Sequence, residues 1–510
     1  MPHSAADDAL AAWRLHDPRI DTKEVLVQDL SSGSLPEAFT AGAHAHPDSV
    51  LAVGDDALTL AEFVERAERW AGALEAAGVT PGRRVMLQAT TSAAMVCAYL
   101  GLLRAGATIV LVSPALTATE LATIAMQSGA RLAITDHETP HGVSRLPLAE
   151  LAEAAVVARP TSLPGPSSGD VALIAFTSGT TGTPKGVPLT HGMLLASIRA
   201  VMRAWRWSAG DRLVHALPLS HQHGLGGIHA TLIAGSSARL LSGFDPAALI
   251  QEIRAESATV LFGVPTIYQR LVGLPGDNAA ALSSLRLATS GSAPLPPALF
   301  HRIEEKLGIT PLERYGLTES GLDVSNLYTG PRRPGVVGFP LPGVELRLTA
   351  DNGTDVAFGA EGEIALRGPQ VFDGYLDDPQ ATARAFHPGG WFRTGDLGRI
   401  TEDGALAITG RLKDIIVTGG MNVSPREVED VLAAHPDVEE AAVTGLPDER
   451  WGEAVAAWVV LRRAVDVATL TAYCRDVLAP FKCPKTITVV DALPRNALGK
   501  VQRNLLIGRQ

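Results

Sequence analysis

The segment at positions 177–186, TSGTTGTPKG, places three glycines, four threonines and one lysine directly after the apolar run VALIAF. Glycines let a backbone approach a ligand closely, and threonine hydroxyls, backbone N–H groups and a lysine ammonium all attract phosphate oxygens. The segment differs from the phosphate-binding pattern GxxxxGK[ST], because Pro184 precedes Lys185 and Gly186 follows it. Its chemistry favours a nucleotide polyphosphate, although the same letters taken alone also fit a flexible surface loop.

Four later segments contain charged and aromatic residues, among them Tyr315, Asp396 and Lys500. Taken singly, each residue has an ordinary interpretation, since Asp396 could cap a turn, Tyr315 could belong to the core and Lys500 could be a solvated charge. The segments are RYGLTES (314–320), GWFRTGDLG (390–398), GRLKDIIVTGGMNVSPREVE (410–429) and PRNALGKVQR (494–503).

The regions between these segments alternate β-rich runs with helical patterns, which is typical of parallel α/β units. Positions 58–78 have apolar residues at helical spacing and end at a glycine, and RRVMLQA follows as an expected strand. The apolar stretch 93–112 fits a buried helix followed by a buried strand better than a membrane span, because Arg104 interrupts it. Later in the chain short strands and turns take over, and Asn352-Gly353 indicates a hairpin.

Composition argues against several classes of protein. The 43 Lys and Arg residues against 54 Asp and Glu leave a formal net charge of -11, and no basic block offers a track for nucleic acid. The three cysteines, Cys97, Cys474 and Cys483, form no CxxC pair, so neither a disulfide framework nor a zinc site is indicated. The acidic N-terminus lacks the basic start and apolar core of an export signal. We therefore expect a cytoplasmic protein with no membrane span.

The five segments occur in an order and spacing that resembles the adenylate-forming superfamily, which comprises acyl-CoA synthetases, luciferases and stand-alone adenylation domains. The resemblance extends over most of the chain. It implies that a carboxylate attacks the α-phosphate of ATP to give an acyl-adenylate and pyrophosphate, and that the CoA thiol then displaces AMP. ATP, Mg²⁺ and CoA are therefore the expected cofactors, and a small-molecule carboxylic acid is the expected partner.

The resemblance also implies the fold class. We expect an α/β protein with a large N-terminal domain of layered sheets and helices, residues 1–410, which binds the acyl group and the nucleotide. A small mobile C-terminal α+β domain, residues 411–510, is expected to rotate between the two steps about a hinge at Lys413. Gly419 and Gly420 would then line the CoA channel.

The nucleotide contacts are implied residue by residue. Tyr315 would stack on adenine, Asp396 would accept both ribose hydroxyls, and Arg411 would contact the ribose or a phosphate. Residues of the first segment would hold the β- and γ-phosphates, and Thr318 would bond the α-phosphate. The expected nucleotide-binding residues are Thr177, Ser178, Thr180, Thr181, Lys185, Gly291, Ser292, Ala293, Pro294, Tyr315, Gly316, Thr318, Asp396 and Arg411.

Catalytic roles are expected for Lys500, His221, Thr318 and Glu319. Lys500 would reach the α-phosphate and the attacking carboxylate oxygen, where negative charges must be brought together. Glu319 would hold Mg²⁺, a hard cation that favours carboxylate and phosphate oxygens. His221 and His223 form an HxH pattern, but without a nearby carboxylate this is weak evidence for a metal site.

The acyl pocket is implied by segments such as PLSHQHGLGG (218–227) and LFGVPTIYQRL (261–271). Its glycines indicate room for a bulky acid, because each removes a side chain from a possible wall. Ser220 stands where the family usually has an aromatic residue, which leaves the wall between acid and CoA channel open to question. The expected pocket residues are His221, Gly226, Gly263, Val264, Thr266, Gly291 and Gly321.

The identity of the acid stays open at this point. VPTIYQR, ERYGLTES and PGVVGFPLPGVELRL are similar to the malonyl-CoA synthetase branch, in which Arg270 could pair a second carboxylate, yet Arg270 equally fits a solvated helix charge. PLSHQHG lacks the aspartate by which amino-acid-activating members hold an amine. Two other functions stay open: transfer to the phosphopantetheine of a carrier protein, and a chain that performs only one half-reaction.

Overall fold

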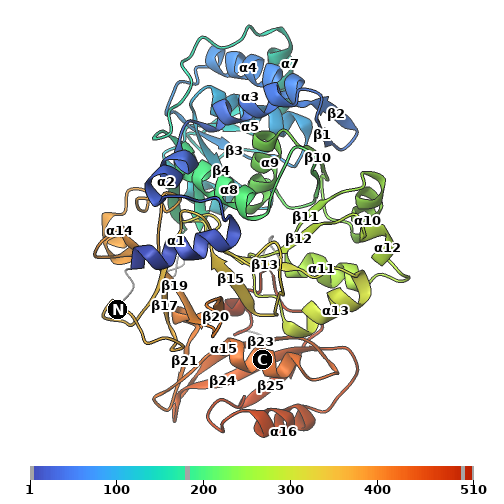
Figure 1. The fold of residues 1–510 in the computed structure, drawn as a ribbon, viewed down its shortest axis with the longest axis vertical. Helices are drawn as coiled ribbons and strands as arrows, with labels where there is room; N and C mark the ends of the chain where they lie inside the picture. The colour runs from blue at the N-terminus through green and yellow to red at the C-terminus, as the bar shows by residue number, and fades with distance from the viewer. Residues whose placement is uncertain (1–4, 178–183, 496–499, 508–510) are drawn as a thin grey trace.

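Two of the three sheets belong to a large N-terminal domain, and the third belongs to a small C-terminal domain at the bottom of Figure 1. The computed structural model describes residues 5–177, 184–495 and 500–507. Helices lie on the sheets of both domains (Figure 1). The predicted α/β fold of a large and a small domain is confirmed.

The six-stranded sheet has the order β6-β5-β3-β4-β7-β8 and is parallel except for β8, which returns antiparallel beside β7. The helix predicted at 58–78 is α4, which begins at a capping box formed by Thr59 and Glu62. The stretch 93–112 is α5 followed by β4, as predicted. The elements are β3 (Arg84–Leu87), β4 (Thr108–Leu111), β5 (Leu132–Ile134), β6 (Ser144–Leu146), β7 (Val171–Thr177), β8 (Lys185–Thr190), α4 (Leu60–Ala76), α5 (Ala93–Arg104), α6 (Ala118–Ser128) and α7 (Leu148–Val157).

The fourteen-stranded sheet changes from parallel to antiparallel along its length. Its parallel part has the order β1-β10-β9-β11-β12-β13, and from β13 to β16 neighbouring strands are antiparallel. The segment 314–320 therefore leaves the last parallel strand at its carboxyl end, where open α/β sheets commonly bind ligands. The strands are β1 (Val50–Val53), β2 (Asp56–Thr59), β9 (Arg212–His215), β10 (Ser237–Leu240), β11 (Val260–Gly263), β12 (Leu287–Ser290), β13 (Leu312–Tyr315), β14 (Val324–Ser325), β15 (Val336–Pro340), β16 (Glu345–Thr349), β17 (Gly362–Arg367), β18 (Phe386–His387), β19 (Trp391–Ile400) and β20 (Leu406–Arg411).

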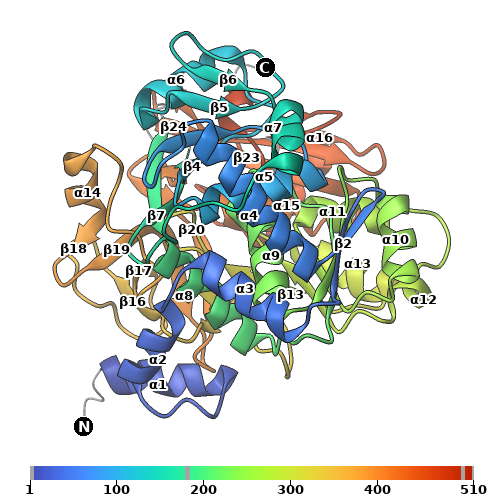
Figure 2. The same ribbon diagram turned by 90° about the horizontal axis from the view of Figure 1, so that it is seen from above.

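The two large sheets are held together by helices that lie between them. Helix α3 contacts α4, α5, α8 and α9, and these helices lie together in both views (Figures 1 and 2). Its N-terminus is closed by a capping box of Ser34 and Glu37. The remaining helices of this domain are α3 (Leu35–Ala45), α8 (His191–Ala204), α9 (Gln222–Ala234), α10 (Pro246–Ala255), α11 (Pro265–Val272), α12 (Ala279–Leu282), α13 (Pro297–Leu307) and α14 (Pro379–Ala385).

The predicted turn at Asn352-Gly353 follows β16. Gly353 adopts a φ of 78°, and the Asn352 side chain accepts a hydrogen bond from the backbone N–H of Thr354 at 3.0 Å. The hairpin that it closes is short, with one bridge between Thr349 and Asp355, because β16 pairs mainly with β17.

The small domain has its own five-stranded sheet and its own apolar core. That core includes Ile416, Val428, Val443 and Leu470, all fully buried. The segments PREVEDVLA and VATLTAYCRDV form helices α15 and α16 on this sheet. The elements are η1 (Leu412–Asp414), β21 (Ile416–Thr418), β22 (Met421–Val423), α15 (Pro425–Ala433), β23 (Val438–Asp448), β24 (Gly452–Leu461), α16 (Val467–Val477), β25 (Thr486–Val489) and η2 (Arg503–Leu505).

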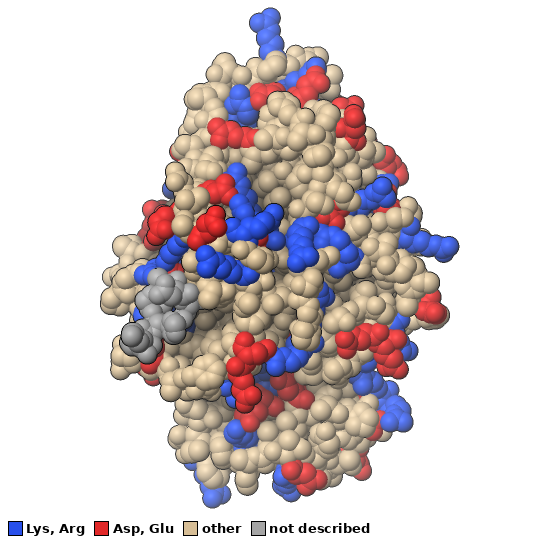
Figure 3. Space-filling view, viewed as in Figure 1, with Lys and Arg blue, Asp and Glu red and all other residues tan. Residues whose placement is uncertain are grey.

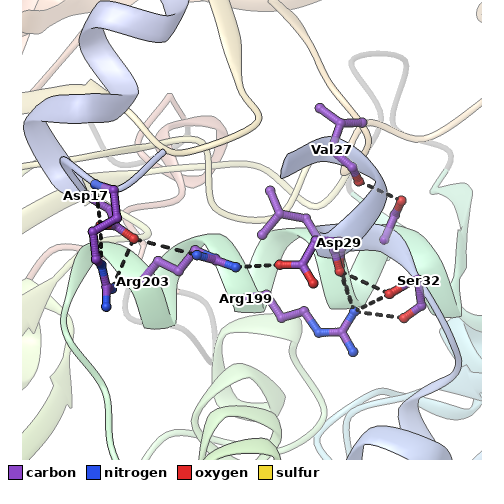
Figure 4. A network of polar contacts seen from close by, with 9 residues as sticks. Asp17, Val27, Asp29, Ser32, Arg199 and Arg203 are labelled. Carbon is purple, nitrogen blue, oxygen red and sulfur yellow. Dashed lines mark hydrogen bonds and ion pairs between the residues drawn. The ribbon is translucent and has the colours of Figure 1, made fainter. Parts of the chain in front are cut away.

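Two N-terminal helices, α1 (Ala5–His16) and α2 (Lys23–Ser31), are fastened to α8 by a charged network (Figure 4). Arg199 of α8 donates to the backbone carbonyls of Asp29 and Ser32 at 2.9 and 2.8 Å, so a cation closes the C-terminal end of α2. Arg203 of α8 pairs with Asp17 and with Asp29. These contacts attach the N-terminal segment to the large domain.

The surface of the face seen in Figure 3 carries both signs of charge. Lys and Arg side chains gather across the middle of this face, with Asp and Glu side chains among and beside them. Among the described helices, none has both the length and the apolar character needed to cross a bilayer. Cys97, Cys474 and Cys483 are free and buried.

Candidate active site

A cavity of about 290 Å³ lies between the large and the small domain, and we call it the central cavity. The large domain contributes the ends of β12 and β13. It also contributes β19 and β20, which pair with each other in the same sheet. The small domain contributes α15, β23 and the segment around Lys500. Of the expected site residues, the cavity is lined by Thr266, Ser292, Ala293, Pro294, Tyr315, Gly316, Asp396, Arg411 and Lys500.

Asp396 is a buried carboxylate with a partner for each oxygen. Arg411, its cross-strand neighbour on β20, forms an ion pair with Oδ1 at 2.6 Å, and the hydroxyl of Tyr315 donates to Oδ2 at 2.7 Å. A buried carboxylate needs such charged and hydrogen-bonding partners to offset its loss of hydration. This arrangement puts an oriented acceptor on the cavity wall beside an aromatic ring, which fits an adenosine.

The segment Gly291–Pro294 follows β12 and forms the wall beside Tyr315. Ser292 adopts a φ of 65°, an uncommon conformation for a residue with a side chain that often marks a functional turn. Its hydroxyl pairs with Nδ1 of His223 at 3.1 Å. A side chain at Gly316 would collide with the backbone of Gly321, so this glycine permits the tight turn after Tyr315.

Glu319 lies in the same turn and is 8% exposed. Burial raises the pKa of its carboxyl group, and a hydrogen bond from the Tyr375 hydroxyl to Oε1 at 3.1 Å acts in the opposite direction. No group of three or more His, Cys, Asp or Glu residues gathers as a metal site within the described residues. Mg²⁺ is commonly held by one or two carboxylates together with substrate phosphates, and a single carboxylate such as that of Glu319 is compatible with this mode.

Segment 177–186 begins and ends on paired strands. Thr177 at the end of β7 pairs with Lys185 at the start of β8, and the Lys185 ammonium lies 4.7 Å from the ring centroid of Tyr375. Ser178, Thr180 and Thr181 lie outside the described residues. Thr318 is partly buried beside Glu319. Tyr375 was not predicted, since nothing in the surrounding DGYLDD distinguishes it from a packing residue.

Lys500 is half-buried and lines the central cavity. Burial lowers the pKa of its ammonium to about 8, and the charge of Arg411 adds to this effect while that of Asp396 opposes it. Lys413 lies in η1, directly after β20. Gly419 and Gly420 lie in the β21–β22 turn and are not among the residues that line the cavity; the Gly419 N–H donates to the carbonyl of Trp451 at 2.7 Å.

Arg314 is a buried cation that sequence reasoning did not single out. It is 6% exposed, and its Nε and Nη2 have no hydrogen-bond partner within the described part of the chain. Nε2 of His221, Nε2 of His223 and Oγ of Ser290 are also buried without partners there. Burial lowers the pKa of His223 well below its ordinary value, and the charge of Arg314 lowers it further. Of these residues Arg314 and Ser290 line the central cavity, so this wall carries a buried guanidinium beside polar groups.

The prediction that glycines leave room for a bulky acid is wrong at three of these positions. The space where a side chain would stand is filled by Tyr268 at Gly263, by Arg314 at Gly291 and by Ser197 at Gly321. Glycine is needed at these three positions because neighbouring side chains pack closely against the backbone. These positions do not border open space. Gly226 has a more open surrounding, with an Ile198 methyl at 3.8 Å, and Val264 is buried. Arg270 is exposed and lies over the Phe244 ring at 4.8 Å.

A family model of AMP-binding enzymes matches residues 39–376, and a model of the AMP-binding enzyme C-terminal domain matches residues 427–500. The chain belongs to the AMP-binding enzyme family. A feruloyl-CoA synthase of Amycolatopsis sp is 37% identical over 461 residues, which are 88% of this chain and 93% of the relative. The mitochondrial malonate–CoA ligase of Mus musculus is 37% identical over 406 residues, 72% and 70% of the two chains.

The structural comparison agrees with the family. The crystal structure of ATP-bound MatB from Rhodopseudomonas palustris superposes with a TM-score of 0.88 at 37% identity, covering 93% of this chain and 98% of that one. This member of the AMP-binding enzyme family is an acid:CoA ligase that uses ATP, Mg²⁺ and CoA. It activates a carboxylic acid as an acyl-adenylate and transfers the acyl group to the CoA thiol. The alternative of a single half-reaction is not favoured by these relatives.

Replacing Asp396 by alanine should weaken ATP binding. Loss of hydrogen bonds to a charged group typically costs about 1.5–3 kcal/mol, so we expect a roughly 10- to 100-fold higher Kd in calorimetry. Asp403→Ala is the matched control, because Asp403 also pairs with an arginine, Arg333, but is exposed at the β19–β20 turn. Equal ATP affinity in both variants would contradict a ribose contact at Asp396.

Proposed function

We propose that this ligase activates a small dicarboxylic acid of the malonate type. One carboxylate would react with ATP, and the other would pair with Arg314. The observation that carries the proposal is the buried guanidinium of Arg314, whose Nε and Nη2 have no partner among the described residues. The buried carboxyl group of Asp323 favours the charged form of Arg314, but it leaves Nε and Nη2 unpaired. Buried N–H groups without acceptors are unfavourable, so the site gains from a ligand whose carboxylate accepts hydrogen bonds from them.

The form of the pocket supports the same class of acid. A guanidinium presents its N–H groups in a planar fork that matches the two oxygens of a carboxylate. His223 lies near Arg314 and His221 lies near His223, and these two residues with Ser290 supply further unpartnered polar atoms. The filled spaces at Gly263 and Gly321 favour a short acid. Arg270 is an unsuitable partner because it lies over Phe244 on the exposed side of α11. The malonate–CoA ligases and MatB among the relatives support this assignment.

The proposed adenylation step uses residues on both walls of the central cavity. Asp396 and Tyr315 hold the adenosine, and Thr318 contacts the α-phosphate. Lys500 offsets the negative charge that accumulates where the acid carboxylate meets this phosphate. Glu319 is the proposed ligand of Mg²⁺, which when bound neutralises phosphate charge.

The remaining nucleotide contacts are proposed around the triphosphate and the adenine. Lys185, with Thr177 and the other threonines of segment 177–186, holds the β- and γ-phosphates. Backbone groups of Gly291–Pro294 and Gly316 lie against the adenine, and Arg411 contacts the ribose or a phosphate. His221, at the N-terminus of α9, borders the reacting carboxylate.

We further propose that residues 1–410 and 411–510 are the two moving domains, with Lys413 as the hinge. Support comes from the position of η1 between β20 of the large sheet and β21 of the small sheet. Lys500 lines the cavity while the Gly419–Gly420 turn does not, which is the arrangement needed for adenylation. Rotation would bring this turn to the CoA channel for the second step. The free, buried cysteines support a reducing compartment such as the cytoplasm.

Arg314→Gln should abolish the preference for a dicarboxylic acid. We expect the activity with malonate to fall roughly 100-fold or more, because the buried second carboxylate loses its charged partner. The measurement is acid-dependent pyrophosphate release over a panel of malonate, acetate, propionate and ferulate. Arg270→Gln is the control and should retain activity with malonate. A wild-type preference for ferulate, or full malonate activity in Arg314→Gln, would refute the assignment.

Lys500→Ala should separate the two half-reactions. Loss of one preorganised donor typically slows the step about 100- to 1000-fold, so acid-dependent ATP–pyrophosphate exchange should fall by that factor. A chemically prepared acyl-adenylate plus CoA should still give thioester. Lys482→Ala, which removes an exposed ammonium paired with Glu427, should retain both reactions. Exchange retained with thiolation lost would place Lys500 in the other step.

Lys413→Pro should block the second step and spare the first. Proline fixes φ and removes the N–H, so the backbone at the hinge could not change conformation. We expect pyrophosphate release at the wild-type rate without thioester formation, measured in the same reaction mixture. Lys413→Ala keeps backbone freedom and should perform both steps. If the proline variant also performs both steps equally well, the hinge lies elsewhere.

A further inference from the structure

Tyr375 lies between two residues with proposed contacts to the triphosphate and its metal ion. Its hydroxyl donates to Oε1 of Glu319 at 3.1 Å, and its ring centroid lies 4.7 Å from the ammonium of Lys185. Glu319 follows β13, and Lys185 begins β8, so the two residues come from different sheets. Tyr375 thus contacts both groups at once.

The backbone around Tyr375 is fixed to the same two segments. The N–H of Phe372 donates to the carbonyl of Glu319 at 2.8 Å, and the N–H of Leu376 donates to the carbonyl of Gly186 at 2.9 Å. The N–H of Tyr375 itself donates to Oγ1 of Thr382 in α14 at 2.9 Å. Five residues therefore bridge the turn after β13 and the start of β8, with Tyr375 as the side chain that faces both.

We propose that Tyr375 is a positioning residue for the magnesium complex of ATP. Its hydroxyl holds the Glu319 carboxylate in one orientation, and its ring holds the Lys185 ammonium nearby before the phosphates bind. A carboxylate and a lysine side chain each lose rotamer freedom when they bind a ligand, and prior orientation reduces that loss. The cation–π contact is weak enough for the ammonium to exchange it for a phosphate oxygen. This role is independent of which acid the ligase activates.

The ring of Tyr375 also packs edge-on against Phe372, with centroids 4.9 Å apart. A variant that removes the ring changes this packing as well as the contact to Lys185. Tyr375→Phe keeps the ring and removes only the hydroxyl that reaches Glu319. Comparing the two variants therefore separates the contact of Tyr375 with Glu319 from its contact with Lys185.

The test is calorimetric binding of ATP with Mg²⁺, of ATP with chelator, and of AMP, all without acid or CoA. Tyr375→Phe should bind the magnesium complex about tenfold more weakly, while its affinities for metal-free ATP and AMP stay unchanged. Tyr375→Leu should weaken both forms of ATP and leave AMP unchanged, because AMP lacks the β- and γ-phosphates. Tyr328→Phe is the matched control: Tyr328 lies beside Arg206 and Arg286 and does not line the cavity, so all three affinities should match wild type.

Two outcomes would overturn the role of Tyr375. Unchanged affinity of Tyr375→Phe for the magnesium complex would show that its hydroxyl does not position Glu319. An equal loss of affinity for AMP in this variant would show that Tyr375 supports only the general fold of the site. Thermal melting identifies a variant that does not fold, and if Tyr375→Leu fails, Tyr375→Phe decides alone. Because no acid is present, these results do not depend on the proposal for Arg314.

Discussion

The wall of the central cavity depends on the contacts of one buried carboxylate, that of Asp396. A buried charge needs partners, and here they are Arg411 on the adjacent strand and Tyr315 at the end of β13. In the sheet order, β20, β15 and β14 lie between β19 and β13, so the sheet must curve to bring Tyr315 to Asp396. Arg411 is also the last residue of β20, directly before η1. The ion pair between Asp396 and Arg411 therefore holds part of the cavity wall in place. It also lies directly before the small domain begins.

A second constraint comes from β13 itself. Arg314 and Tyr315 are successive residues of this strand, so their side chains leave it on opposite faces. Tyr315 reaches Asp396, whereas Arg314 lies against Gly291 near His223. The strand β13 therefore directs these two side chains to opposite faces, which is the separation that the proposed nucleotide and acid sites require.

The segments that contain Tyr315, Asp396, Arg411 and Lys500 were singled out in the sequence by their resemblance to the adenylate-forming superfamily. These four residues line the central cavity. Helix α4 and the pair α5–β4 were also predictable from apolar spacing. Arg314 was not singled out from the sequence, because the burial of its unpaired Nε and Nη2 depends on residues that other segments supply.

The glycines of the acyl pocket illustrate the same limit. A missing side chain was taken for open space, yet at Gly263 and Gly321 the space is occupied by Tyr268 and by Ser197. Spacing along one segment does not say which residue of another segment packs there. Tyr375 also could not be predicted, because its two contacts join segments that are far apart in the sequence.

The small domain holds its C-terminal segment against α15. Its apolar core and the bidentate pair between Arg503 and Glu429, at 2.7 and 2.9 Å, make this connection. The Gly419–Gly420 turn belongs to the same packed sheet. Under the proposed rotation, Lys500 and this turn would therefore move together as parts of one domain.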